Sequence, residues 1–581
     1  MVLSLDSLPE EVLYSILCYC HPTSSAALEQ TARRFKNVTN EPLLWRSYCK
    51  THFKHWDQRH RLPEKLAGPV RSVSWKALYV SRHHIDRVTS SLLDKIIASQ
   101  TGRINKFRTI VDFGYDIKDT LLRHLSVGPE TEDYLARRYY AQALLTQLNR
   151  GLAIAEWEKL RTGGIVSLER ALGAFDLFIP KDGDGGLDDI TTKLNDIAIQ
   201  FISEFPNIRQ LSPREKALAV ASYLRRSNLT GIEPEREYHL LEHNFLGVAL
   251  DDPDHNALPL ISAAIYCYVA QKLGLNARPC GFPLHVHVIV TPAPGFDIDG
   301  NELDFAKQGE PMYLDPFNSQ QETHISNLQN QLLLLGASNI ERSNFLGESS
   351  TPQIVLRCGR NILASIQRMH RFPNVRQAEI DLPSAKYAAF WSFMLFSGFT
   401  QPAELRQYLP WLMELFTMDF PSDVHLVEQH IVPLLRGLPE YEDTLESLHD
   451  IRTADEMPKQ VRRRTTSNKS VRYRIGQVFR HRRYKYKAII TGWDMECEAA
   501  ENWMRTMGID HLQGGRHQSF YHALVEDRTV RYVAEENIEP IDRSLDELPS
   551  NLVAVAGRHF KRWDAHTRSF VSNVRDEYPD D

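Results

Sequence analysis

The chain lacks the features that place a protein in or across a membrane. No uninterrupted apolar run reaches the roughly 18–20 residues that a bilayer-spanning helix needs. The first residues, MVLSLD, lack the basic start, the apolar core and the small-residue cleavage site of a secretory signal. Cysteine is scarce, with 7 residues among 581 and no CxxC pair, which is typical of free thiols in a reducing compartment. We therefore expect a protein of the cytoplasm or nucleus with no membrane contact.

The chain also lacks a strong charge of either sign. Its net charge is -6, so nothing in the overall balance drives binding to nucleic acid or to an anionic membrane. Any such binding would need a local basic patch. Hydrophobic residues make up 42% and charged residues 24%, which is ordinary for a globular protein. The length of 581 residues predicts about three or four domains.

The pattern of apolar residues changes along the chain and predicts a multidomain α+β protein. Helical spacing dominates the first 160 residues, a mixture of helix and strand follows, and short strands separated by turns come near the end. The predicted segments are 1–55 and 56–160, both helical; 161–345, mixed; 346–452, helical; 453–470, a flexible basic linker; 471–543, strands; and 544–581, a tail.

A motif near the N-terminus indicates a binding module. Leu8-Pro9-Glu10-Glu11-Val12-Leu13, followed by spaced apolar residues and then Leu44-Trp45, resembles an F-box. The resemblance implies that a Skp-type adaptor, a cullin and a RING protein are partners, and that ubiquitin transfer occurs on other subunits. The residues expected to bind the adaptor are Leu8, Pro9, Val12, Leu13 and Ile16. Alternatively, these helices begin a larger domain.

The middle of the chain resembles the SirB-type branch of the transglutaminase-like, papain-related superfamily. The motifs are a helix predicted from about Asn256 to Leu273 and ended by Gly274, a strand over 283–290, and Tyr313-Leu314-Asp315. Active members use Cys, His and Asp, with the Cys at a helix start that lowers its pKa. His285 and Asp315 match the His and Asp positions, but residues 257–261 contain no thiol.

This missing nucleophile predicts that the middle domain is catalytically dead, with His285 and Asp315 vestigial. Three residues keep the enzyme alternative open: Cys267, Cys280 and Ser262. A cysteine hydrolase or transglutaminase would have to use one of them. The run from His239 to His243 fits the H-x-x-E-H zinc pattern. No third ligand is apparent, so we expect neither a metal nor any other cofactor.

The segment 473–540 resembles the YccV/HspQ family, a small β-barrel often described as binding hemimethylated DNA. The motifs include Gly492-Trp493-Asp494 and the stretch HRRYKY at 481–486, where the family has H-R-R-x-G-Y. Lys485 thus stands where glycine is usual. The residues expected to bind a protein or nucleic acid are Arg480, His481, Arg482, Arg483, Tyr484, Tyr486, Trp493 and Tyr521.

Basic and aromatic side chains on such a surface can hold phosphate and stack bases, or can dock an acidic peptide. We expect protein binding, because Glu496, Glu498 and Glu501 follow closely, and weak DNA binding mainly through Arg462, Arg463 and Arg464 in the linker. The combined prediction is a substrate-recognition subunit of a Skp–cullin–F-box ubiquitin ligase, without catalysis of its own. A DNA- or chromatin-binding protein is the first alternative.

Overall fold

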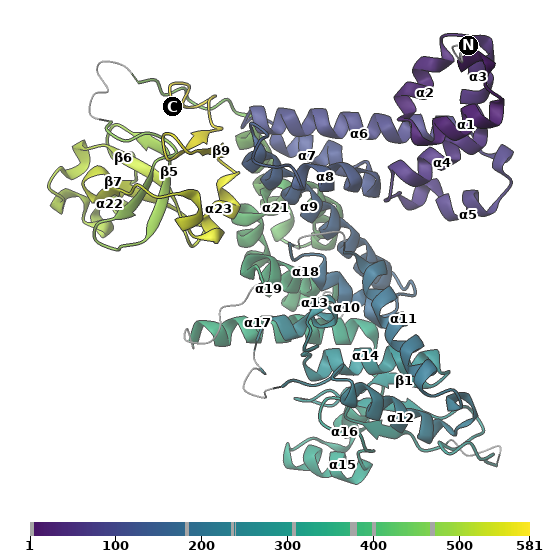
Figure 1. The fold of residues 1–581 in the computed structure, drawn as a ribbon. Coiled ribbons are helices and arrows are strands. Elements are labelled where there is room, and N and C mark those ends of the chain that lie inside the picture. The colour runs from purple at the N-terminus through teal and green to yellow at the C-terminus, as the bar shows by residue number, and fades with distance from the viewer. Residues whose placement is uncertain are drawn as a thin grey trace. The chain divides into compact units, whose positions relative to one another are not determined.

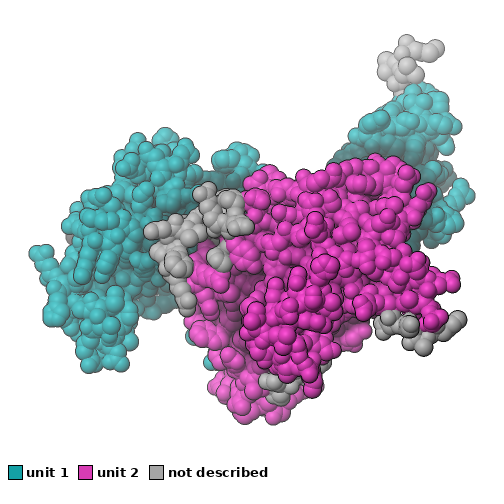
Figure 2. Space-filling view, turned by 90° about the horizontal axis from the view of Figure 1, so that it is seen from below, with its two compact units in different colours: residues 1–148, 449–581 teal, residues 149–448 magenta. Residues whose placement is uncertain are grey.

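The computed structural model describes residues 5–180, 185–233, 238, 240–304, 309–371, 380–397, 402–464 and 471–581 (Figure 1). The chain divides into two compact units. Unit 1 contains residues 1–148 and 449–581, and unit 2 contains residues 149–448 (Figure 2). Helical regions and separate small antiparallel sheets follow one another along the chain, so it is a multidomain α+β protein, as predicted. None of the helices within the described ranges is long and apolar enough to cross a membrane.

Four short helices form the N-terminal module of unit 1: α1 (Glu10–Tyr19), α2 (Pro22–Glu29), α3 (Arg33–Thr39) and α4 (Pro42–His52). Prolines occupy the first position of α2 and α4, where a missing N–H costs no hydrogen bond. Pro9 itself is the N-cap of α1, without a side-chain hydrogen bond to the helix. The module's core is formed by Leu13, Leu17, Phe35, Val38, Leu44, Trp45, Tyr48 and their neighbours.

The helices that follow are α5 (Leu62–Ala67), α6 (Trp75–Ala98), α7 (Arg103–Val111), α8 (Lys118–Leu125) and α9 (Tyr134–Arg161), with a 3-10 turn, η4 (Gly114–Ile117). Trp75 and Tyr79 at the start of α6 belong to the core of the N-terminal module. The module is therefore packed directly on the connector helices and is not separated from them by a free linker.

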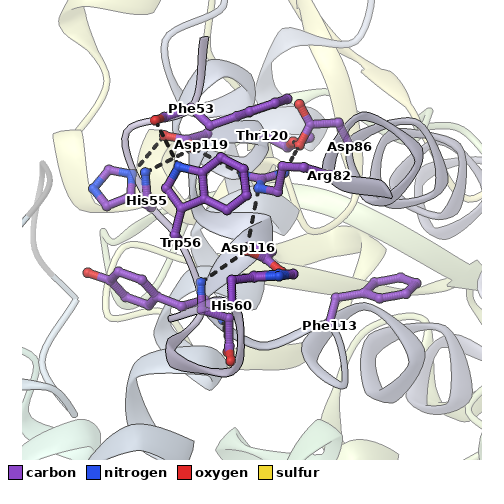
Figure 3. Close-up of polar contacts among 12 residues, drawn as sticks. Phe53, His55, Trp56, His60, Arg82, Asp86, Phe113, Asp116, Asp119 and Thr120 are labelled. Carbon is purple, nitrogen blue, oxygen red and sulfur yellow. Dashed lines mark hydrogen bonds and ion pairs between the residues drawn. The ribbon is translucent and has the colours of Figure 1, made fainter. Parts of the chain in front are cut away.

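A buried ionic network strengthens this attachment (Figure 3). The fully buried Arg82 of α6 forms ion pairs with Asp86, Asp116 and Asp119; the last two are 3.5 and 3.0 Å away. His55 Nδ1 lies 2.7 Å from Asp119, and His60 Nε2 lies 2.6 Å from Asp116, so the segment after α4 is held to α8 and η4. Removing one member of such a network leaves buried charge unpaired, at a cost of about 3–5 kcal/mol.

Unit 2 contains a layer of helices around a three-stranded antiparallel sheet with the order β1-β2-β3. The strands are β1 (Asn276–Pro279), β2 (Val288–Thr291) and β3 (Met312–Leu314), and the helices before them are α10 (Leu168–Asp176), α11 (Leu187–Glu204), α12 (Pro213–Arg226), α13 (Leu246–Asp251) and α14 (Pro259–Lys272). As predicted, a proline opens α14 and Gly274, with φ of +81°, follows its end. The predicted strand over 283–290 is wrong in its first half, because the exposed Leu284 adopts φ of +66° and turns the chain before β2.

The rest of unit 2 is helical, as predicted. Its helices are α15 (Ile325–Leu334), α16 (Asn339–Leu346), α17 (Thr351–Arg371), α18 (Leu382–Ser397), α19 (Pro402–Asp419), α20 (Val424–Leu426) and α21 (Glu440–Glu456). A buried bidentate ion pair between Arg150 and Asp423, with N–O distances of 2.7 and 2.8 Å, joins α9 to the turn before α20.

The last part of unit 1 is built on a five-stranded antiparallel sheet with the order β7-β6-β5-β4-β8. Its elements are β4 (Val478–His481), β5 (Lys487–Asp494), α22 (Glu501–Met507), β6 (Phe520–Val525), β7 (Val530–Ala534) and β8 (Ile538–Pro540). Its buried side chains form a core that includes Phe479, Ile489 and Trp493.

Residues 544–581, predicted as a tail, are part of this domain. They form α23 (Ser550–Ala556), β9 (Phe560–Asp564) and β10 (Ser569–Ser572), and they add apolar side chains such as Phe560, Phe570 and Tyr578 to the same core. They also reach the connector helices, since Tyr140 Oη donates to the Arg558 carbonyl at 2.9 Å and Gln100 N donates to Asp576 at 2.8 Å.

The predicted flexible linker over 453–470 is also corrected at its start. Helix α21 continues to Glu456, and the carboxylate of Asp455 accepts hydrogen bonds from Arg103 N and Ile104 N at the first turn of α7. An acidic side chain at a helix start satisfies free N–H groups and the helix dipole. Residues 465–470 lie outside the described residues.

Candidate functional site

The outer face of the N-terminal module is apolar. Val12, Ile16 and Tyr19 of α1 are 42%, 41% and 94% exposed, and Leu5 just before them is 51% exposed. These α1 residues follow helical spacing, so they share one face, while Leu13 and Leu17 point into the core. Of the residues predicted to bind an adaptor, Pro9, Val12 and Ile16 are exposed and Leu8 is partly buried. The inclusion of Leu13 is wrong, because its side chain is only 1% exposed.

His285 and Asp315 lie together, as their motif positions predicted. Nε2 of His285 is 2.8 Å from Oδ1 of Asp315. The carboxylate also accepts hydrogen bonds from Phe317 N, Asn318 N and Asn318 Nδ2. Burial would raise the pKa of Asp315, but the contact with His285 and these hydrogen bonds lower it below its ordinary value. The pair therefore holds the turn after β3 in place.

The thiols of Cys267 and Cys280 are both buried. Cys267, in the second half of α14, and Cys280, after β1, are fully buried, and burial raises both thiol pKa values, that of Cys280 to about 11. Cys280 Sγ lies 3.1 Å from the Phe345 carbonyl and packs in an apolar cluster. The buried Ser262 donates to the Ala257 carbonyl and accepts from Gly231 N, so its hydroxyl is used within the fold.

The sequence analysis missed a second histidine at this place. His287 is buried between the rings of Phe282 and His285, each 5.1 Å away between ring centres. Burial lowers its pKa to about 4, so the ring is neutral at physiological pH. The alternation His285-Val286-His287 is visible in the sequence. No family motif assigns a role to the second histidine, however, so the sequence does not distinguish it from an ordinary core residue.

The H-x-x-E-H pattern does not lie on an α-helix where it is described. Residues 242–244 form a 3-10 turn and His243 is buried, while His239 lies outside the described residues. Within the described part of the chain, no group of three or more His, Cys, Asp or Glu side chains could hold a metal ion.

The turn between β4 and β5 carries the predicted basic and aromatic side chains. We call residues 481–486 the tyrosine turn. The rings of Tyr484 and Tyr486 are parallel within 7° at 6.5 Å, with Arg483 over Tyr484 and Arg531 over Tyr486. Lys485 lies between them at φ of +62°. Arg483, Tyr484 and Arg531 are exposed and can stack on a planar or aromatic partner, whereas Tyr486 is partly buried against the core.

Other residues of that predicted site have structural roles. His481 is buried, and its Nδ1 accepts hydrogen bonds from the Arg483 and Tyr484 N–H groups, which shapes the tyrosine turn. Arg480 and Arg482 are both exposed, and Arg480 forms an ion pair with Glu539 at 2.9 Å.

Trp493 and Tyr521 were predicted to bind a ligand, and both are core residues. Their exposed fractions are 2% and 0%. Tyr521 Oη donates to Glu535 and accepts from Arg472 N and Tyr473 N, and Trp493 Nε1 donates to Asp581. The two-residue period of a strand shows which residues share a face but not which face is covered.

Three arginines of the predicted linker are paired within the chain. Arg462 contacts Asp494 and Glu498, Arg463 contacts Asp580, and Arg464 contacts Asp581. The expectation that these arginines are available to DNA is therefore not supported by their contacts.

Comparisons with known proteins agree with this arrangement. Three family profiles match in order: "F-box-like" over residues 5–51, "Transglutaminase-like superfamily" over 188–360, and "Hemimethylated DNA-binding protein YccV like" over 471–567. F-box only protein 21 of Pongo abelii is 25% identical over 92% of this chain and 86% of its own length. The Homo sapiens protein of that name is 24% identical with the same coverage.

The chain is similar to F-box only protein 21 along most of its length. Its three matched segments coincide with the N-terminal module, the region around His285 and Asp315, and the five-stranded sheet with β9. A shorter match, 24% identical over 23% of the chain, is to a Neosartorya fischeri protein named as a probable E3 ubiquitin ligase complex SCF subunit, sconB. No solved structure matches the chain.

Proposed function

We propose that this protein is the substrate-recognition subunit of a Skp–cullin–F-box ubiquitin ligase. The observation that carries the proposal is the exposed apolar face of α1, formed by Val12, Ile16 and Tyr19, on an F-box-like module. Exposed apolar side chains clustered on one small module mark a surface that another protein covers. The likeness to F-box only protein 21 over most of the chain and the match to a ligase subunit support the same role.

The partners proposed are a Skp-type adaptor on the α1 face, and a cullin and a RING protein through that adaptor. Ubiquitin transfer then belongs to those subunits, and this chain supplies substrate binding. Such a complex works in the cytoplasm or nucleus. The C-terminal domain is proposed to bind protein; the alternative of a DNA-binding protein has less support, because the linker arginines are engaged by carboxylates.

The middle domain is proposed to have no catalysis of its own. The residues at the start of α14 include no thiol, and both cysteines near the family site are buried with raised pKa values. A thiol in an apolar environment is a poor nucleophile because its reactive form is the thiolate. His285 and Asp315 support the turn after β3 and leave the domain's surface available for binding.

A single substitution tests the adaptor surface. Ile16→Asp places a charge in the centre of the α1 face, so we expect it to abolish co-purification of a Skp-type adaptor with the full chain. Central interface residues commonly contribute about 2 kcal/mol or more each. Because Ile16 is 41% exposed, the substitution should leave the unfolding temperature nearly unchanged.

The matched control is Ile199→Asp on α11, where isoleucine is 63% exposed. It introduces the same charge on another helix and should leave adaptor binding intact. Adaptor binding that survives Ile16→Asp, or is lost equally in both variants, would contradict the proposed function.

A further inference from the structure

The last residues of the structure occupy a formed carboxylate site in the C-terminal domain. The side chain of Asp581 is 1% exposed. Arg464 donates to it through Nε at 3.1 and 3.0 Å and through a terminal nitrogen at 2.8 Å. Trp493 Nε1 donates at 3.0 Å, and Ile475 N lies at 3.4 Å. One carboxylate is thus met by a guanidinium, an indole and a backbone N–H.

An aromatic side chain enters the same place three residues earlier. Tyr578 is 3% exposed, and its ring centre lies 5.5 Å from that of Trp493. Its hydroxyl is 3.3 Å from Trp493 N. A Cβ atom added at Gly492 would lie 2.8 Å from that hydroxyl, so this depth of entry requires glycine at position 492.

The segment 462–464 runs beside the occupant. Arg462 N donates to the Glu577 carbonyl at 2.7 Å, and Arg464 N donates to Asp580 at 2.9 Å. Both the occupant, residues 577–581, and the arginines lie outside residues 471–567, which match the YccV-like family. The occupant and the arginines are therefore additions to the family domain, whereas Trp493 and Ile475 belong to it.

The site's main cation is positioned by residues other than its occupant. The Arg464 guanidinium donates to the Val471 carbonyl at 3.1 Å and to the Tyr473 carbonyl at 2.7 Å, and it lies over the Trp493 ring at 5.4 Å. None of these three contacts involves residues 577–581. A preformed cation and a preformed aromatic wall reduce the cost of binding a ligand.

We propose that this site binds an acidic segment of a partner protein in which an aromatic residue precedes two carboxylates, and that residues 577–581 are a competing internal ligand. That the partner is a substrate of the ligase rests on the proposed function; the binding site itself does not. An internal ligand acts at a high effective concentration, of millimolar order for a short connection. A separate peptide should therefore bind well only after the internal segment is removed or weakened.

The test uses a peptide with the sequence of residues 576–581, labelled with fluorescein and amidated at its C-terminus. Fluorescence anisotropy compares the full chain with a chain lacking residues 577–581, both without adaptor. We expect Kd at least tenfold lower for the shortened chain. Peptides with alanine for tyrosine, or with asparagine for the last two aspartates, should lose that affinity.

Substitutions in the shortened chain assign the binding to the site. Arg464→Gln should raise Kd at least tenfold, because it removes the donors to Asp581. Arg543→Gln is the matched control, since it removes a guanidinium that is 56% exposed and pairs with Glu547 away from the site, and it should leave Kd unchanged. Equal Kd values for the two variants would overturn the proposal.

A second variant covers the case in which the shortened chain does not fold. Asp581→Asn in the full chain keeps Tyr578 in the core and weakens only the carboxylate contacts, so the labelled peptide should bind it more tightly than the unaltered chain. If neither the shortened chain nor this variant gains affinity, the proposal is wrong.

A dimer that exchanges residues 577–581, detected by light scattering, would make a second copy of this chain the occupant of the site and would also overturn the proposal. Adaptor binding has no part in these measurements, so a failure here leaves the proposed function untouched.

Discussion

Lys485 is a residue whose side chain does not suit its backbone conformation. Its φ of +62° is left-handed, which favours glycine and costs other residues on the order of 1 kcal/mol. Glycine removes this strain, and its larger loss of backbone freedom on folding offsets only part of the gain. We therefore expect Lys485→Gly to stabilise the β4–β5 hairpin by about 0.5–1 kcal/mol. Amide hydrogen exchange of β4 and β5 in the full chain should slow by about two- to fivefold.

The control for this prediction is Arg483→Gly, two residues earlier in the tyrosine turn. Arg483 is not among the residues with positive φ, and its guanidinium lies over the Tyr484 ring at 5.3 Å. Glycine there should speed exchange. Faster exchange in Lys485→Gly would show that the lysine side chain, and not the backbone, decides the stability of the turn.

At the scale of single elements, the burial of α14 and of the residue after β1 determines how reactive the thiols of Cys267 and Cys280 are. The helix is buried along almost all of its length, and Cys267 lies in its second half. We expect Cys267 and Cys280 to resist iodoacetamide at neutral pH in the native chain, since burial raises the pKa of both thiols. Mass spectrometry of the labelled chain should find the reagent on Cys18, Cys20 and Cys497, which are partly exposed.

The same labelling of His285→Ala provides the control. If His285 only supports the turn after β3, the pattern of modified cysteines should not change. Rapid labelling of Cys280 or Cys267 that disappears in His285→Ala would contradict the absence of catalysis and revive the hydrolase alternative.

Helix boundaries were predictable from the sequence where a proline or a glycine marked the position. Pro259 and Gly274 marked α14, and Pro42 marked the start of α4. The positive φ of Leu284, which shortens β2, has no sequence signature because glycine and asparagine normally mark such a position.

The candidate site was predictable in part. Motif spacing placed His285 beside Asp315, since each motif fixes a position relative to the strands. Burial was not predictable for Leu13, Trp493 or Tyr521, because an apolar or aromatic residue on a short helix or strand suits the core and an interface equally well. The site around Arg464 depends on contacts between residues more than 100 positions apart, which no local pattern contains.

At the scale of the whole chain, unit 1 is assembled from both ends of the sequence. Residues 544–581 supply core side chains including Leu552, Phe560 and Phe570, and they bind helix α9 and the turn that follows α6. A chain ending at 543 should therefore lose cooperative unfolding of unit 1. Each large core side chain is worth about 3–5 kcal/mol, so the loss of these three is as large as the usual stability of about 5–15 kcal/mol.

A chain ending at 576 is the comparison, because it keeps these core residues and the Asp576 contact with Gln100. Hydrogen exchange should show α6–α9 protected in the chain ending at 576 and unprotected in the chain ending at 543. Equal protection in both would mean that the connector helices fold without the C-terminal segment.

The ionic network around Arg82 also limits where this chain could be divided and joined to another protein. The F-box-like match ends at residue 51, yet His55 and His60 are bound to Asp119 and Asp116 far along the chain. A recombination breakpoint at residue 52 would separate those histidines from α4 and expose the Trp75 and Tyr79 that complete the module's core. The F-box-like module of this chain is thus not structurally independent, and a fusion protein that preserves its folding should carry the residues up to Leu125 with it.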